Sequence, residues 1–297
     1  MTQVAALLET AAQAARDESS SPAERAEMLM QLGTGLQTRP KTLEHLAAAV
    51  ELYDQALALC PAHEVLLGAR IAARRASALL ALPAADHGAT EQARGVLEEV
   101  LPLLARHGTA AEVAEAEMNL GLCLQYLAGA GRARMPDAIA AYQRALRTFD
   151  ARRYPAEFAI LQNNLATAFL ATRSPLSEAL AVQCFEHALK AVNLLDHPVE
   201  YAMLQNNLGN ALQSVASSHL ADNCLRALAA YDEALKVRTR EARPAEHANT
   251  LANRANCLWT LGRIEEAKTC YAQAQEIFAA LGEHDKARAV GEAMAAG

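Results

Sequence analysis

The chain has 297 residues, of which 52% are hydrophobic and 21% charged, enough apolar material for an extensive buried core. Its formal net charge of −7 disfavours nucleic acid and anionic membranes as partners. The N-terminus lacks a basic region followed by an uninterrupted apolar stretch, and no segment approaches the ~18 apolar residues of a membrane span. The six cysteines show no CxxC spacing, so we expect free thiols and a reducing, cytoplasmic location.

A proline-led phrase recurs along the chain. Proline at the first turn of a helix has a favourable φ and loses no hydrogen bond, and a glutamate two residues later suits the positive end of the helix dipole. Where the proline is absent, Thr109 is a candidate N-cap with Glu112 in the acidic position. The phrase therefore predicts helix starts, at Pro22, Pro155, Pro198 and Pro244.

The phrase belongs to a repeat of 43 to 46 residues. A small residue marks the first helix of each unit, at Gly33, Ser77, Gly121, Ala166, Gly209 and Ala255. A second helix follows, written YDQAL, LEEVL, YQRAL, FEHAL, YDEAL and YAQAQ. Apolar residues at helical spacing and the absence of strand patterns predict an all-α fold, a right-handed α-solenoid of about six helix-turn-helix repeats. The predicted segments are a capping helix at 1–21, repeats at 22–64, 65–108, 109–154, 155–197, 198–243 and 244–282, and a capping helix at 283–297.

Two stretches resemble a known family. The last unit, LWTLGRIEEAKTCYAQA, resembles a tetratricopeptide repeat, although the other units are about ten residues longer than the ~34 of that repeat. The phrase QNNLGNA at 205–211 is similar to the long-repeat subgroup found in kinesin light chains and many bacterial arrays. This resemblance implies a concave groove, lined by the first helix of each unit, that binds a peptide or a partner protein.

A ladder of polar residues occupies one position of the first helices, two residues before the small anchor. An amide side chain offers both an acceptor and donors, which suits a peptide group. The resemblance implies that asparagine at this position holds the backbone of an extended ligand. The alternative is structural, with each asparagine bonding the neighbouring unit. The ladder comprises Gln31, Arg75, Asn119, Asn164, Asn207 and Asn253, and the neighbouring candidates are Asn163, Asn206, Asn210 and Asn256.

Arg74 and Arg75 stand side by side in the first helix of the second unit, where they could receive an acidic group. Solvated or internally paired arginines are the competing interpretation. Gly129-Ala130-Gly131-Arg132 lacks the GK[ST] ending of a nucleotide-binding loop, and neither zinc spacing nor a GxSxG motif is present. We therefore predict a protein that is not an enzyme and has no metal and no cofactor.

The predicted function is a scaffold, adaptor or assembly chaperone that binds a protein or peptide partner. The alternative is a regulatory sensor whose groove takes a small molecule or a signalling peptide. The C-terminal stretch carries an apolar face that leaves a homodimer through the terminal helices open, formed by Ala287, Ala289, Val290 and Ala293.

Overall fold

The computed structural model describes residues 8–11, 13, 15, 19–38, 42–82, 87–215 and 220–296. All regular secondary structure in these residues is helical, which confirms the all-α prediction. None of the helices that the model describes is long and apolar enough to cross a lipid bilayer. The chain forms two compact units, Met1–Thr148 and Phe149–Gly297. Most of the predicted capping helix at 1–21 lies outside the described residues. Within this segment, residues 8–11, 13 and 15 are described as helical.

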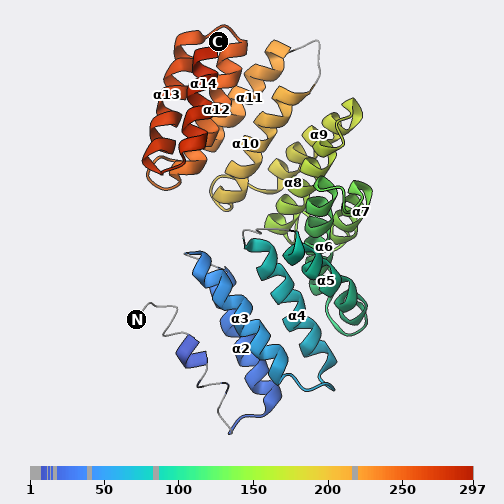
Figure 1. Ribbon diagram of the computed structural model, residues 1–297. Helices are drawn as coiled ribbons and strands as arrows, with labels where there is room; N and C mark the ends of the chain where they lie inside the picture. The colour runs from blue at the N-terminus through green and yellow to red at the C-terminus, as the bar shows by residue number, and fades with distance from the viewer. Residues whose placement is uncertain are drawn as a thin grey trace. The chain divides into compact units, whose positions relative to one another are not determined.

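The N-terminal unit, blue to green in Figure 1, consists of helix pairs that pack on one another in chain order. Repeat one is α2 with α3, repeat two is α4 with α5, and repeat three is α6 with α7. The first helices are also neighbours, because α4 contacts both α2 and α6. The bounds are α2 (Pro22–Thr38), α3 (Leu43–Leu59), α4 (Val65–Ala81), α5 (Gly88–His107), α6 (Ala110–Gly129) and α7 (Met135–Ala145).

The C-terminal unit, yellow-green to red in Figure 1, repeats this plan. Repeat four is α8 with α9, repeat five is α10 with α11, and repeat six is α12 with α13. The first helices again lie together, since α10 contacts both α8 and α12. The bounds are α8 (Pro155–Ala171), α9 (Pro175–Ala191), α10 (Pro198–Ser214), α11 (Leu220–Leu235), α12 (Pro244–Thr260), α13 (Ile264–Ala280) and α14 (His284–Ala296).

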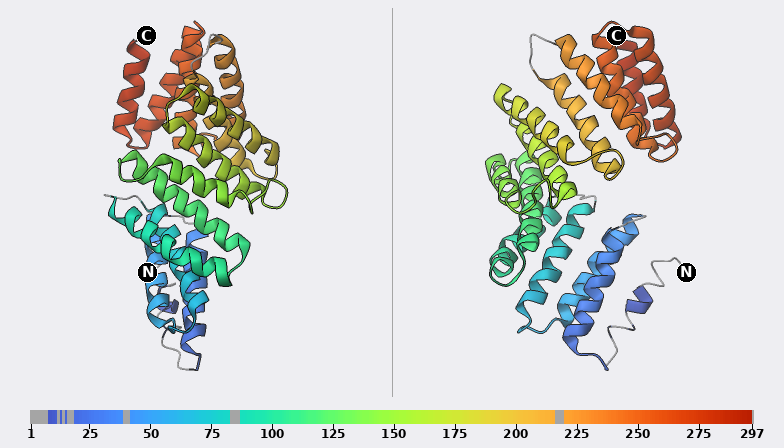
Figure 2. Two further views of the ribbon diagram at one scale, coloured as in Figure 1. Left: turned by 90° about the vertical axis from the view of Figure 1, so that its right-hand side faces the viewer. Right: turned by 180° about the vertical axis from the view of Figure 1, so that it is seen from behind.

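The last helix, α14, packs on α13 at the red end of the chain in Figure 2. Of the four residues in its predicted apolar face, Ala287 and Val290 are buried, whereas Ala289 and Ala293 are exposed. The larger part of that face is therefore covered within the chain. What remains exposed for a second copy is two methyl groups.

The helix starts follow the predicted chemistry. Each recurring proline is the first residue of its helix, at α2, α8, α10 and α12. At α6 the predicted cap is confirmed as a capping box: the Glu112 N–H donates to Thr109 Oγ1 at 3.2 Å, and the Thr109 N–H donates to Glu112 Oε2 at 2.7 Å. Glu112 also ties two repeats together, because Arg70 Nε of α4 donates to its Oε1 at 2.6 Å.

A buried tyrosine fixes the approach of the two helices in repeats one, three and five. The rings of Tyr53, Tyr142 and Tyr231 are fully buried. Each lies so close to the anchor glycine of the first helix that a Cβ there would fall 2.9, 2.5 and 2.5 Å from a ring carbon. Each hydroxyl bonds a glutamine four residues after that glycine. The glycines are Gly33, Gly121 and Gly209, and the glutamines are Gln37, Gln125 and Gln213.

The same positions in repeat four hold different residues. The anchor is Ala166, the second-helix aromatic residue is Phe185, which is fully buried, and the glutamine is replaced by Leu170. Without a hydroxyl group to satisfy, no amide is required at the last position. All three positions thus differ in repeat four, whereas repeat six keeps Tyr271 with Ala255 and Trp259, and there the hydroxyl donates to Asn256 Oδ1 instead.

We expect Gly121→Ala to destabilise the N-terminal unit by about 1 to 3 kcal/mol, because the new methyl group would overlap the Tyr142 ring. Gly95→Ala is the matched control, since Gly95 lies inside α5 with nothing within 4 Å of an added Cβ. The control should gain up to about 1 kcal/mol from helix propensity. Urea denaturation of both variants measures the difference, and equal effects would contradict the packing described here.

The Glu112 contacts predict a pH dependence. The Arg70 guanidinium, helped by Thr109, lowers the carboxyl pKa below its ordinary value of 4.5, so the folded state favours the charged form. Its contribution is complete above pH 4.5 and is lost as the pH falls through the lowered folded-state value. Glu112→Gln should cost about 1 kcal/mol at neutral pH and progressively less in acid.

Denaturation of wild type and Glu112→Gln in steps from neutral pH to about pH 3 checks this convergence. Glu99→Gln is the control, because Glu99 is exposed on α5 and its change should leave stability nearly constant throughout. A Glu112→Gln deficit that persists undiminished in acid would contradict the assignment.

Candidate functional site

The predicted asparagine ladder lies on the first helices, which neighbour one another within each unit. In the C-terminal unit the ladder residues bond across repeats. Asn207 Nδ2 of α10 donates to Asn163 Oδ1 of α8 at 2.7 Å. Asn163 Nδ2 in turn donates to Asn164 Oδ1 at 3.3 Å. Because Asn163 is only 9% exposed, this bond satisfies a buried amide.

The same pattern continues into repeat six. Asn206 Nδ2 donates to Asn207 Oδ1 at 3.1 Å, and Thr250 Oγ1 of α12 lies 3.1 Å from Asn206 Oδ1. Arg238 Nη1 donates to Thr250 Oγ1 at 3.1 Å. Asn206 and Thr250 are also buried. We name this connected set the amide chain: Asn163, Asn164, Asn206, Asn207, Thr250 and Arg238.

The amide chain has a charged end. Arg238 has a side chain only 12% exposed, and its nearest carboxylate is Glu246 at 3.7 Å. Burial lowers the pKa of this guanidinium, with Glu246 acting in the opposite direction. The hydroxyl of Thr250 gives the buried arginine an acceptor that leucine, present at this position in repeats four and five, would not provide.

Two further candidates hold tyrosine hydroxyls. Tyr231 Oη donates to Asn210 Oδ1 at 2.7 Å, and Tyr271 Oη donates to Asn256 Oδ1. Each tyrosine lies on the second helix of the repeat whose first helix carries its asparagine. The acceptor oxygen of each asparagine is therefore engaged inside the fold.

Asn119 and Asn253 differ from the other ladder residues. Both are half-buried, and neither side chain makes a hydrogen bond within the described ranges. The main-chain carbonyl of Asn253 does accept a bond from Gln213 Nε2 at 3.1 Å. The same residue type at the same helix position thus has a partner in repeat five and none in repeats three and six.

The two adjacent arginines of α4 separate as well. Arg75 pairs with Asp54 of α3, with its side chain only 16% exposed. Arg74 forms no ion pair and no hydrogen bond in the part of the chain that the structure describes. Of these two arginines, Arg74 is therefore the one whose guanidinium is available to an outside ligand.

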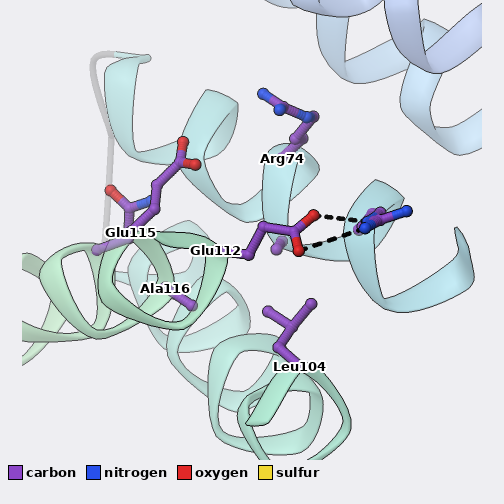
Figure 3. Close-up of a pocket in the computed structure, with 8 residues that line it drawn as sticks. Arg74, Leu104, Glu112, Glu115 and Ala116 are labelled. Atoms are coloured by element: carbon purple, nitrogen blue, oxygen red, sulfur yellow. Dashed lines mark hydrogen bonds and ion pairs between the residues drawn. The ribbon is translucent and has the colours of Figure 1, made fainter. Parts of the chain in front are cut away.

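Arg74 and Asn119 line one pocket between α4 and α6, with a volume of about 30 Å³. Glu115 lies on α6 one turn before Asn119 and is likewise half-buried without a bonded partner among the described residues. Figure 3 shows Arg74 and Glu115 on facing helices, with Leu104 and Ala116 also lining the pocket. The neighbouring charges, Arg70 and Glu112, are already bonded to each other.

Metal-ligating side chains are not gathered in the described ranges. These ranges contain no group of three histidine, cysteine, aspartate or glutamate residues placed to hold a metal ion. Burial raises the pKa of Cys123 to about 12 and that of Cys184 to about 11, so both are protonated and poorly nucleophilic at neutral pH.

Sequence reasoning missed Glu115, Thr250, Gln37 and Gln125, and it treated Gln213 only as a further polar neighbour of the ladder, not as a partner of a tyrosine hydroxyl. The glutamines carry a signal, because each follows an anchor glycine by four residues in a repeat whose second helix has tyrosine. Thr250 carries one too, as a polar residue where the other C-terminal repeats have Leu161 and Leu204. Glu115 has no distinguishing pattern before the pocket is seen.

Comparisons with known proteins agree with this architecture. A family model described as tetratricopeptide repeat matches residues 248–281, which lie in α12 and α13. No curated protein matches the chain in a sequence search. The crystal structure of BtubC from P. vanneervenii is similar in fold at 20% identity with a TM-score of 0.57, over 95% of this chain and 93% of that one.

Two other solved structures share the fold at low identity. The pilF protein of Pseudomonas aeruginosa is 16% identical with a TM-score of 0.59, over 90% of this chain and 98% of that one. A putative kinesin light chain of Podosopora anserina with nearly identical TPR-like repeats is 16% identical with a TM-score of 0.53, over 75% and 99%. The chain thus contains a matched tetratricopeptide repeat at residues 248–281, within a fold that is similar to these solved structures.

Proposed function

We propose that the protein is a non-catalytic interaction module that binds a peptide or a partner protein against its first helices. The observation that carries this proposal is the pocket between α4 and α6, where Arg74, Glu115 and Asn119 are half-buried and have no bonded partner in the described chain. None of their polar atoms is among the buried side-chain atoms that lack a partner in the described chain, so these atoms are accessible from outside the fold. A surface that leaves three together is suited to receive hydrogen-bond partners from a ligand.

The asparagine ladder then divides into two classes. Asn163, Asn206 and Asn207 serve repeat stacking through the amide chain. Asn119 and Asn253 remain as ligand-binding candidates, and Asn164 keeps donors that no internal bond uses. The proposal therefore gives Asn207 the structural role and Asn119 and Asn253 the ligand-binding role, although all three stand at the same ladder position.

The biological role that fits is a scaffold, adaptor or assembly chaperone. A regulatory sensor uses the same surface for a small molecule or signalling peptide, so the size of the ligand separates the two roles. The cytoplasmic location stays the expectation from the free cysteines and is part of this proposal.

The division of the ladder predicts opposite results at one helix position. Asn207→Ala would leave Asn163 Oδ1 and Asn206 Nδ2 buried without partners, at a cost of about 2 to 4 kcal/mol. Asn253→Ala removes a side chain with no bond and should change stability by less than about 0.5 kcal/mol. Thermal and urea denaturation of the two variants checks this, and equal destabilisation would contradict the assignment.

Ligand binding is tested with a random peptide display library selected on the full-length protein. Asn119→Ala and Asn253→Ala, shown first to be folded, should each weaken the selected peptides that contact them by about five- to tenfold. Gln273→Ala is the control, since Gln273 is exposed on the second helix of repeat six. If no peptide binds and a metabolite fraction stabilises the protein instead, the result would contradict the adaptor role and support the sensor role.

A further inference from the structure

The charged side chains between α4 and α6 form two successive rungs. At the first rung, Arg70 of α4 donates two hydrogen bonds to Glu112 of α6, at 2.6 and 3.3 Å. About one helical turn further along, Arg74 and Glu115 occupy the equivalent places, but no ion pair within 4.0 Å joins them. The second rung is therefore open, and the pocket lies at this opening (Figure 3).

The groups at the open rung define what can fill it. Arg74 can only donate hydrogen bonds, Glu115 as a carboxylate can only accept them, and Asn119 can do both. A carboxylate in the gap would be attracted by Arg74 but repelled by Glu115, and an ammonium the reverse, so the attraction and the repulsion oppose each other for either charge. A neutral group that accepts on one side and donates on the other satisfies all three residues.

The size of the gap narrows the choice. The pocket, of about 30 Å³, has room for a small polar head group but not for a bulky side chain. A primary amide supplies two polar atoms, an oxygen and a nitrogen, whereas a hydroxyl group supplies one. The apolar side chains of Leu104 and Ala116, which also line the pocket, leave the amide carbons in apolar surroundings.

An apolar surface adjoins the pocket on the same face of α6. Leu122 is 37% exposed and Tyr126 is 54% exposed, and their spacing continues the stripe begun by Glu115 and Asn119. The centre of this apolar pair lies about seven residues, or about 10 Å, along the helix from the two polar residues. An extended peptide covers that distance in about three residues.

We propose that the open rung binds the side-chain amide of an asparagine or glutamine in a partner segment, which carries a large apolar residue about three positions away. The amide carbonyl accepts from Arg74, and the amide NH₂ donates to Glu115. Asn119 completes the set, and the apolar residue covers Leu122 and Tyr126. This inference rests on the proposed peptide-binding function and names the chemistry that its ligand supplies.

The test changes one group on the peptide and one group on the protein. Peptides are selected from a random display library on the full-length wild-type protein, and the enriched asparagine or glutamine is changed to aspartate or glutamate. On wild type this isosteric change should weaken binding at least tenfold, because two carboxylates then face each other. On Glu115→Gln the acidic peptide should recover most of that loss, because the new amide donates to it.

Glu99→Gln, an identical change at an exposed position on α5, is the control and should give no recovery. Arg74→Met should weaken the amide peptides and remove their preference over the acidic ones. Peptides that bind without an enriched amide, or an acidic change that Glu115→Gln does not rescue, would overturn this inference and leave the proposed function standing. A library from which no peptide is enriched would overturn both.

Discussion

The close contact between a buried tyrosine ring and a glycine of the partner helix sets the geometry on which the repeats depend. An isolated helix pair buries little apolar surface, so it depends on packing against the next pair. Its own two helices must therefore pack closely. Glycine lets the tyrosine ring lie where a methyl group would collide with it, as at Gly121 and Gly209. The hydroxyl then needs an acceptor, which is Gln125 Oε1 for Tyr142 and Asn210 Oδ1 for Tyr231, where Gln213 donates to the same hydroxyl.

Polar side chains between neighbouring first helices also find hydrogen-bond partners, in a different way in each unit. In the C-terminal unit the amide chain links α8, α10 and α12. In the N-terminal unit the ion pair of Arg70 and Glu112 links α4 to α6, and Gln37 Nε2 of α2 donates to Ser77 Oγ of α4 at 3.0 Å. The proposed binding surface is therefore the place where internal pairing stops, rather than the place where polar residues are most numerous.

Much of the fold could be predicted from sequence because its causes are local. Helix periodicity, proline at the first turn and the threonine and glutamate of the capping box each act over a few residues, and the helices begin where these signals stand. The fate of each asparagine could not be predicted in this way. Asn207 bonds Asn163 of the preceding repeat, whereas Asn253 makes no equivalent bond among the described residues although the matching residue, Asn206, is also an asparagine. The Asn206 oxygen is bonded by Thr250 instead. Contacts across about 44 residues decide the difference, and a single-sequence pattern does not contain them.

The amide chain also bears on cooperativity. In a linear array each repeat ordinarily unfolds with its own nearest-neighbour term, so the ends fray while the middle persists. Here the bonds of Asn163, Asn207, Asn206 and Thr250 pass without interruption from repeat four to repeat six. Unfolding of any one repeat leaves buried polar groups of the next repeat without hydrogen-bond partners. The interaction free energy between neighbouring repeats is therefore large relative to the stability of each repeat alone. These three repeats should therefore melt as one block, without a populated state in which a single repeat has peeled away.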